Sequence, residues 1–322
     1  MVRSYISLGL KRDKALNVAG ISKDQYYYQP KSGKKGAPKS KSTDKIEGKK
    51  IVKVSNKEVV AFMKEQNSDP DLKYGYHKMT IELMINGFII NHKKVYRLMK
   101  EAHILEPKTV NKEKTYCKYR IVTPEGPLEL LEIDIKYVWV EKQKRHAYIL
   151  TILDTFTRSV LYWAVGFTMR TKQIQAAWEY VIENYLQPMD MLKKGIHIEI
   201  RNDNGPQFNA NAIKEFLKEN YLNQVFTHPY TPQENGHVES FHSISGRHLD
   251  ANTYWSLEQL EIDLTLFYGK YNNERLHSSI AYLPPNTFWE CWNNGLISRQ
   301  VKPNKRVIFK LKIPYHELEF GK

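Results

Sequence analysis

The chain has 322 residues, 41% of them hydrophobic, and a formal net charge of +14. This length allows one sizeable core and a smaller module, so we expect at least two folded units. No run of about 18 apolar residues occurs, and the N-terminus is charged, which excludes a membrane span and a signal peptide. Cys117 and Cys291 stand far apart, so neither a zinc module nor a disulfide framework is indicated. We expect a soluble, cytoplasmic protein.

The excess positive charge is concentrated in the first part of the chain. Residues 1–57 carry 15 Lys/Arg against 4 Asp/Glu, residues 58–127 carry 12 against 9, and residues 128–322 are balanced at 22 against 22. A basic excess favours a polyanion through phosphate contacts. The charge therefore predicts nucleic-acid contacts before residue 128, with a solvated, disordered tail as the alternative for its lysine-rich part.

The N-terminal region divides into a short helical fragment and a linker. Within residues 1–29, apolar positions precede Gly20, and Ser22 is a candidate N-cap for a second helix ending near Tyr28, which is typical of a helix-turn-helix fragment. Residues 30–57 are rich in Lys, Ser, Gly and Pro, and we expect them to form a flexible basic linker.

Residues 58–110 predict a three-helix DNA-binding domain. We expect its helices over Glu58–Glu65, His77–Asn86 and Asn91–Ala102. In the last of these, the apolar residues form one stripe at helical spacing, namely Val95, Leu98, Met99 and Ala102. The opposite face carries a basic and aromatic row, Lys93, Tyr96, Arg97 and Lys100. This predicts a recognition helix for a DNA groove, although an ordinary amphipathic helix would show the same pattern.

After a connector over residues 111–127, the pattern changes to an α/β domain over residues 128–295. Three strand-like segments come first, and then helix, strand, helix, strand and two helices. This order is that of a ribonuclease H-like core, a mixed five-stranded sheet with flanking helices. Residues 296–322 form a basic C-terminal tail that contains a candidate strand.

Three carboxylates occupy informative places in that domain. Asp134 lies mid-strand, where alternation turns it away from Ile133 and Ile135; Asp203 follows the fourth strand, and Glu239 lies on a helix. The first and fourth strands are neighbours in the expected sheet, so the carboxylates can converge. The spacing of thirty-six residues between Asp203 and Glu239 is weak evidence, and the peptides around them carry the prediction.

Clustered carboxylates need cations, because like charges at close range raise one another's pKa values. Oxygen ligands favour two Mg²⁺ ions, for which Mn²⁺ can substitute, in a site for phosphoryl transfer. Two other acids stay open as alternatives. Asp154 could instead cap its own strand, and Glu234 competes with Glu239.

Several motifs resemble the superfamily of DDE transposases and retroviral integrases. They are Asn202-Asp203-Asn204-Gly205 with Gln207-Phe208, and Pro232-Gln233 with Gly236 and Val238-Glu239-Ser240. Four further segments resemble the second-frame product of insertion-sequence transposases of the IS-three family. They are Tyr74-Gly75-Tyr76, Val95 to Lys100, Tyr271-Asn272 and Arg275 to Ser279.

The resemblance implies metal-dependent cleavage of 3′ ends and strand transfer, with Asp134, Asp203 and Glu239 as catalytic metal ligands. It implies that the partner is double-stranded DNA, namely the element's terminal inverted repeats and its target. It also implies a homo-oligomer that acts at the nucleoid of a bacterial cell. An upstream-frame product with a helix-turn-helix and leucine zipper is a further expected partner. We also expect DNA contacts from Asn235, Arg247, Arg275 and His277.

One departure from the family pattern concerns a cation. Many relatives carry Lys seven residues after the catalytic Glu, where this chain has Gly246, so the cation that replaces it stays open. Two other functions are alternatives to transposition: a related nuclease without strand transfer, and a DNA-binding regulator with a non-catalytic core.

Overall fold

The computed structural model describes residues 2–28, 39–106, 124–193, 195–227, 236–303 and 306–318. The chain divides into two compact units, Met1–Lys41 and Ser42–Lys322. In these described parts, none of the helices is both long and apolar enough to cross a membrane.

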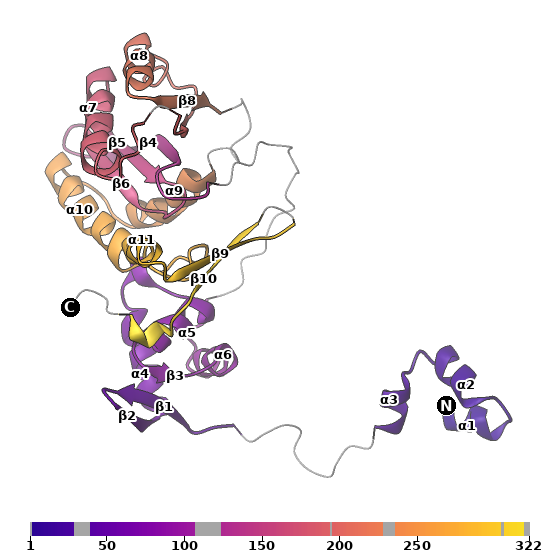
Figure 1. Cartoon of the computed structure of the whole chain (residues 1–322). Helices are drawn as coiled ribbons and strands as arrows, with labels where there is room; N and C mark the ends of the chain where they lie inside the picture. The colour runs from indigo at the N-terminus through magenta and orange to yellow at the C-terminus, as the bar shows by residue number, and fades with distance from the viewer. Residues whose placement is uncertain are drawn as a thin grey trace. The chain divides into compact units, whose positions relative to one another are not determined.

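The first unit is a small helical cluster. It consists of α1 (Val2–Ser7), α2 (Arg12–Val18) and α3 (Lys23–Tyr27) (Figure 1). Ser22 caps α3 as predicted, because its hydroxyl accepts a hydrogen bond from the backbone N of Gln25 at 3.1 Å. Both helices expected here are present, and α1 is an additional one.

The second unit begins with a β-hairpin over residues 42–55, which corrects the later part of the flexible linker predicted over residues 30–57, while residues 30–38 lie outside the described residues. Strands β1 (Ser42–Glu47) and β2 (Lys50–Ser55) pair antiparallel, and β3 (Phe88–Ile89) pairs with the other edge of β1. The third strand comes from far along the chain. The lysine-rich composition of the hairpin therefore gave no indication that it would be part of a sheet.

A helix-turn-helix-like module follows, with helices where the sequence predicts them. They are α4 (Asn56–Gln66), α5 (Tyr76–Ile85) and α6 (His92–Glu101), and the 3-10 turn η1 (Pro70–Leu72) precedes α5. Val95, Leu98 and Met99 are buried in the core of the module. Asn91 caps α6 by accepting a hydrogen bond from the backbone N of Lys94 at 2.9 Å.

The centre of the second unit is a mixed five-stranded sheet with the order β6-β5-β4-β7-β8. The meander consists of β4 (Leu130–Val140), β5 (Arg145–Asp154) and β6 (Val160–Gly166), and the parallel strands are β7 (Ile198–Asn202) and β8 (Leu222–Phe226). The pairing of β4 with β7 confirms that the first and fourth strands are neighbours. This strand order is the predicted ribonuclease H-like one.

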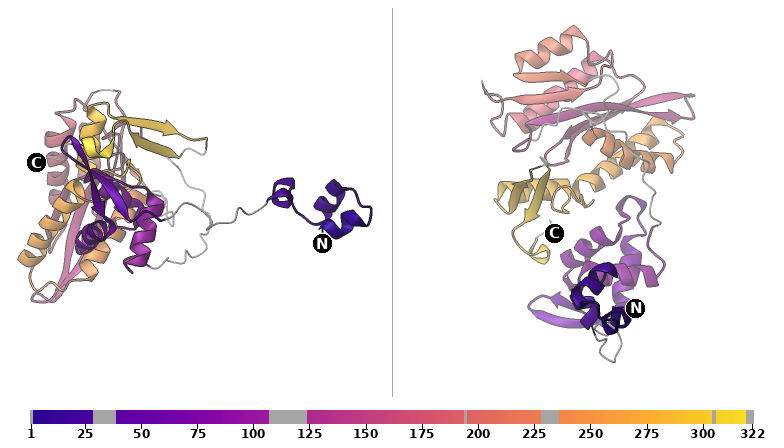
Figure 2. Two further views of the ribbon diagram at one scale, coloured as in Figure 1. Left: turned by 90° about the horizontal axis from the view of Figure 1, so that it is seen from below. Right: turned by 90° about the vertical axis from the view of Figure 1, so that its right-hand side faces the viewer.

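Helices cover both faces of the sheet (Figure 1, Figure 2). On one face lie α7 (Thr171–Val181), a π-helical turn η2 (Ile182–Leu186) and α8 (Asn211–Glu219), and on the other lie α9 (Gly236–Asp250) and α10 (Leu257–Asn273). Alternation along β4 points Leu131 and Ile133 toward α7 and α8, and Val138 and Val140 toward α9 and α10. The even-numbered residues of β4, Asp134 among them, therefore face α9.

The C-terminal segment is folded against the core. After α11 (Pro285–Asn293), strands β9 (Ile297–Val301) and β10 (Val307–Leu311) form an antiparallel hairpin, followed by the turn η4 (Tyr315–Glu317). The ring of Phe309 lies 5.1 Å from that of Phe156 and 5.0 Å from that of Phe288. The expected strand in the tail is thus half of a packed hairpin.

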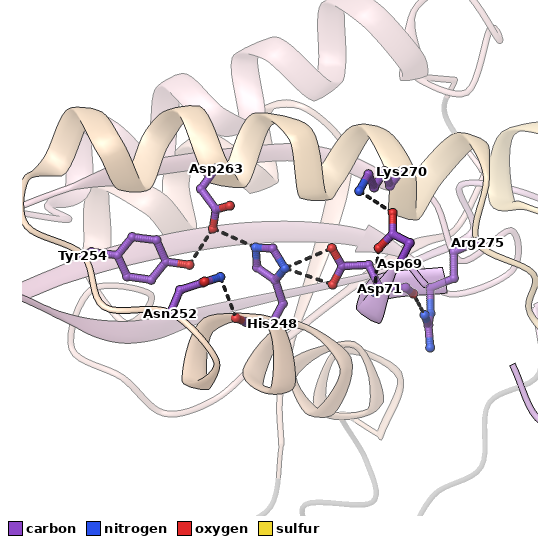
Figure 3. Close-up of polar contacts among 8 residues, drawn as sticks. All are labelled: Asp69, Asp71, His248, Asn252, Tyr254, Asp263, Lys270 and Arg275. Atoms are coloured by element: carbon purple, nitrogen blue, oxygen red, sulfur yellow. Dashed lines mark hydrogen bonds and ion pairs between the residues drawn. The ribbon is translucent and has the colours of Figure 1, made fainter. Parts of the chain in front are cut away.

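Polar contacts join the helix-turn-helix-like module to the sheet domain (Figure 3). His248 of α9 lies between two carboxylates: its Nδ1 is 2.9 Å from Oδ1 of Asp71, and its Nε2 is 2.7 Å from Oδ2 of Asp263. Lys270 Nζ donates to Oδ2 of Asp69 at 2.5 Å. Two acids of the module therefore meet two bases of α9 and α10.

Candidate active site

Asp134 lies in the middle of β4, on the face that α9 covers. Its Oδ1 accepts a hydrogen bond from the backbone N of Ile135 at 2.8 Å, and its Oδ2 lies 3.3 Å from Nδ1 of His242 on α9. Burial, together with the negative charges of Asp203 and Glu239, raises the pKa of Asp134 to about 6. The carboxylate thus senses both of the other acids that the sequence singled out.

Asp203 is the first residue after β7, at the open end of the sheet. β4 and β7 pair in parallel with Glu132 opposite Arg201, so continuing this register by two residues brings Asp203 beside Asp134. Its Oδ1 accepts a hydrogen bond from the backbone N of Gly205 at 2.9 Å. A Cβ at Gly205 would lie 2.9 Å from that same oxygen, so this tight turn leaves no room for a larger residue.

Glu239 lies in the first turn of α9, and its side chain is exposed. Partial burial raises its pKa. The helix is held against β4 at this end, because the carboxylate of Glu132 accepts a hydrogen bond from the backbone N of Val238 at 2.6 Å. Glu239 therefore directly follows Val238, the residue that is hydrogen-bonded to β4.

Asp203 and Glu239 lie close enough to Asp134 for their charges to act on it. Within the described ranges, no three His, Cys, Asp or Glu side chains are close enough together to hold a metal. Asp203 and Glu239 are both exposed, and the hydrogen bond from Gly205 orients the carboxylate of Asp203. The donor set nevertheless fits a hard divalent cation, because it offers carboxylate oxygens and has the raised pKa of Asp134 that a cation would relieve.

The competing acids have different outcomes. Asp154 is fully buried, and its Oδ2 accepts hydrogen bonds from the backbone N and the hydroxyl of Thr157 at 3.0 and 2.6 Å. It caps the turn after its own strand, as the alternative stated. Glu234 lies outside the described residues, so the structure does not test it.

Glu132, which was not among the predicted site residues, positions the site through its hydrogen bond with α9. Glu132 is 1% exposed, and burial raises its pKa to about 7, although backbone hydrogen bonds from Val238 and His237 act in the opposite direction. A signal was present, because Glu132 precedes Asp134 by two residues in a strand and must point to the same face. The same alternation places Lys136 on that face.

The predicted DNA contacts fall into two groups. Lys93, Tyr96 and Lys100 are exposed on α6, Arg97 is half-buried on the same helix, and Arg247 is exposed on α9; Asn235 lies outside the described residues. Arg275 and His277 are each only 8% exposed. Arg275 donates a hydrogen bond to the backbone O of Asp71 (Figure 3), so its place in the junction between the modules corrects the expectation of a surface DNA contact.

Comparison with known proteins agrees with this geometry. The integrase core domain family matches residues 124–232, a second family with that description matches residues 220–285, and an HTH-like domain matches residues 52–112. The two integrase core matches together span about half of the chain and include all three carboxylates. The chain belongs to the superfamily of DDE transposases and integrases.

Relatives of this superfamily member come from bacterial insertion elements. The IS476 uncharacterized 39.2 kDa protein of Xanthomonas euvesicatoria is 26% identical over 221 residues, which are 67% of this chain and 60% of that protein. The protein described as transposase InsK for IS150 of Escherichia coli is 24% identical over 226 residues, 66% of this chain and 76% of that one. The chain thus spans less than two thirds of the IS476 protein.

Among solved structures, the catalytic core domain of BIV integrase is 21% identical, covers 52% of this chain and 97% of that chain, and has a TM-score of 0.37. The fold assignment does not rest on this comparison; it rests on the strand order of the sheet and on the family matches. The predicted family and the ribonuclease H-like fold are confirmed. Members of this superfamily use divalent metals.

Proposed function

We propose that this chain is a DDE transposase that cleaves the 3′ ends of an insertion sequence and joins them to target DNA. The observation that supports the proposal is that β4 and β7 run parallel toward Asp134 and Asp203, and that the charges of Asp203 and Glu239 act on Asp134. Carboxylates from two adjacent strands and a helix are the arrangement that a pair of divalent ions requires.

Asp134, Asp203 and Glu239 would hold two Mg²⁺ ions, for which Mn²⁺ can substitute. When bound, such ions stabilise the attacking and leaving oxygens of a phosphoryl displacement. The chain's own residues prepare the site for them. His242 Nδ1 holds Oδ2 of Asp134, and burial lowers the pKa of His242 to about 4, so the imidazole is neutral at physiological pH and orients the carboxylate without competing as a cation.

The substrate in this proposal is double-stranded DNA, the terminal inverted repeats and a target, held by two or more copies of the chain in a bacterial cell at the nucleoid. The exposed row of Lys93, Tyr96 and Lys100 on α6 supports a DNA groove as the binding site of the HTH-like module. An upstream-frame product remains part of the proposal as a second protein partner.

A joining assay tests the proposal. An end-labelled oligonucleotide with the terminal repeat is incubated with Mg²⁺ or Mn²⁺ and target plasmid. Wild type should nick and join it, while Asp203→Ala and Glu239→Gln should do neither; Glu215→Gln, an exposed acid on α8, is the matched control and should keep activity. Joining that survives Asp203→Ala would refute the assignment. Nicking without joining would favour a nuclease, and end binding without nicking would favour a regulator.

A further inference from the structure

Gly246 is a buried residue in the interior of α9, where glycine is costly. A glycine in a helix interior destabilises it by about 1 kcal/mol relative to alanine. The backbone of Gly246 is not left-handed, so conformation does not demand glycine here. A Cβ on Gly246 would lie 3.2 Å from Nζ of Lys136, so the end of this lysine side chain would have to move by a few tenths of an ångström to make room for it. The missing side chain leaves room for an ammonium group.

Lys136 reaches this place from β4. It follows Asp134 by two residues and shares its face of the sheet. Gly246 lies seven residues after Glu239, about two turns along α9, so both occupy nearly the same face of the helix. Lys136 therefore extends from the strand of one carboxylate to the helix of another.

The charge of Lys136 acts on the site itself. It lowers the pKa of His242, after the larger effect of burial, and it opposes the rise in the pKa of Asp134. Among the described residues, Lys136 forms no ion pair within 4.0 Å, and the position of the absent Cβ of Gly246 lies 3.2 Å from its Nζ and 4.0 Å from Oδ2 of Asp250. A half-buried ammonium beside the carboxylates is thus available to an anion.

The surroundings suit a DNA strand end. β7 pairs with β4 only as far as Glu132, and Tyr254 bridges to Val140, so among the described residues this edge of β4 is unpaired between those two positions. A cleft of about 320 Å³ lies beside this part of β4, and Lys136, Tyr137 and Trp139 line it together with two acids, Glu141 and Asp250. Tyr137 is 55% and Trp139 43% exposed. Tyr137 and Trp139 alternate with Lys136 along β4 and so point to the other face of the sheet, where exposed rings at the strand edge can stack with unpaired nucleotides.

We propose that Lys136, seated over Gly246, binds a phosphate of the terminal nucleotides and positions the DNA end for Asp134, Asp203 and Glu239. The inference rests on the proposed function, and it fills the place of the cation that Gly246 left open. It makes Lys136 a positioning residue for the DNA end, with no part in holding a metal.

Charge relocation tests this inference. Lys136→Met should lower joining of pre-cleaved terminal-repeat DNA roughly 10- to 100-fold, the loss expected for one charge-assisted hydrogen bond, and should reduce the salt slope of end binding by about one phosphate contact. The double variant Lys136→Met with Gly246→Lys returns an ammonium to the same place from α9 and should recover at least half of that loss on a logarithmic scale. Lys136→Gln also removes the charge but keeps a polar side chain, so it is measured beside Lys136→Met and tests the same loss if Lys136→Met does not fold.

The outcomes separate the two proposals. Salt-dependent binding of Asp203→Ala should match wild type, since that acid contacts no phosphate in this scheme, while its joining is abolished. An unchanged salt slope for both Lys136 variants, or a double variant no better than Lys136→Met, would overturn the role of Lys136 and leave the carboxylate site untouched. Joining by Asp203→Ala would instead remove the proposed function, whatever the salt slopes show.

Discussion

The carboxylate of Glu132 accepts a hydrogen bond from the backbone N of Val238 at 2.6 Å, and this bond fixes the start of α9 to β4. Glu132 precedes Asp134 by two positions, and Val238 directly precedes Glu239. Helix N-termini carry unpaired N–H groups and a partial positive charge. A buried carboxylate there accepts a hydrogen bond from such an N–H group and is stabilised by the positive charge. One hydrogen bond therefore sets the separation of two carboxylates that lie more than a hundred residues apart in sequence.

Glu132→Ala should weaken the protein and its activity together. The substitution leaves the N–H of Val238 buried without a partner, which costs about 1–3 kcal/mol of the free energy of unfolding. Glu132→Gln keeps an acceptor oxygen at the same reach, so it should retain most of the stability and of the joining rate. Urea unfolding and the joining assay measure both variants. Equal effects of Ala and Gln would show that the hydrogen bond is not what matters.

The stability of the second unit should depend on the protonation of His248. Burial lowers its pKa, but hydrogen bonds with Asp71 and Asp263 outweigh burial, so the folded pKa is raised above 6.5. A raised pKa means that the imidazolium contributes stability below the unfolded value, and this contribution is lost as pH rises through the folded pKa. The melting temperature should therefore fall from pH 6 upward across this range.

His248→Gln should flatten that pH dependence, because glutamine keeps a polar contact but carries no charge. The exposed His146→Gln is the control and should leave the dependence as in wild type. Thermal unfolding followed by circular dichroism at several pH values decides between them. A slope that persists in His248→Gln would assign it to other groups.

Gly87→Ala should destabilise the module that carries α6. Gly87 has a φ of +83°, and an added Cβ would lie 2.7 Å from the backbone O of Ile46 on β1. Strain and clash together should cost on the order of 2–4 kcal/mol. Gly48→Ala is a matched control, since its φ is +60° with nothing within 4 Å of the added atom, and it should cost only about 1 kcal/mol. Chemical denaturation compares the two variants.

The exposed basic residues of α6 should contribute to DNA affinity. Lys93→Ala and Lys100→Ala should each reduce the salt slope of DNA binding by about one. Lys172→Ala, an exposed lysine on α7 on the other side of the sheet domain, should not. Fluorescence anisotropy against salt concentration measures all three. Identical slopes for wild type and both α6 variants would place the DNA contacts elsewhere.

Local patterns predicted the sheet domain well. The strands and helices from β4 to α10 follow hydrophobic periodicity, and their order alone placed β4 beside β7 and so Asp134 beside Asp203. The sequence could not show what depends on tertiary partners. The hairpin of β1 and β2 gains its third strand from Phe88–Ile89, and the charged Arg275 is buried because Asp71 of another module supplies an acceptor.

Lys136 shows the same limit within the site. Alternation places it on the face of Asp134, yet its contact with Gly246 depends on how α9 crosses the sheet. Glycine in a helical pattern indicates a close approach without naming the partner. The carboxylates could be chosen from sequence because each lies in a distinctive peptide, while the groups that position them lie in ordinary ones.

The most direct test of the central claim is the joining of terminal-repeat DNA by Asp134→Asn across a range of Mg²⁺ and Mn²⁺ concentrations. Asparagine preserves the shape of the side chain on β4 and removes the charge that would bind a cation. We predict joining at background at every concentration, with wild-type folding and DNA binding. Joining by Asp134→Asn within tenfold of the wild-type rate would contradict the assignment of these carboxylates as the catalytic metal site.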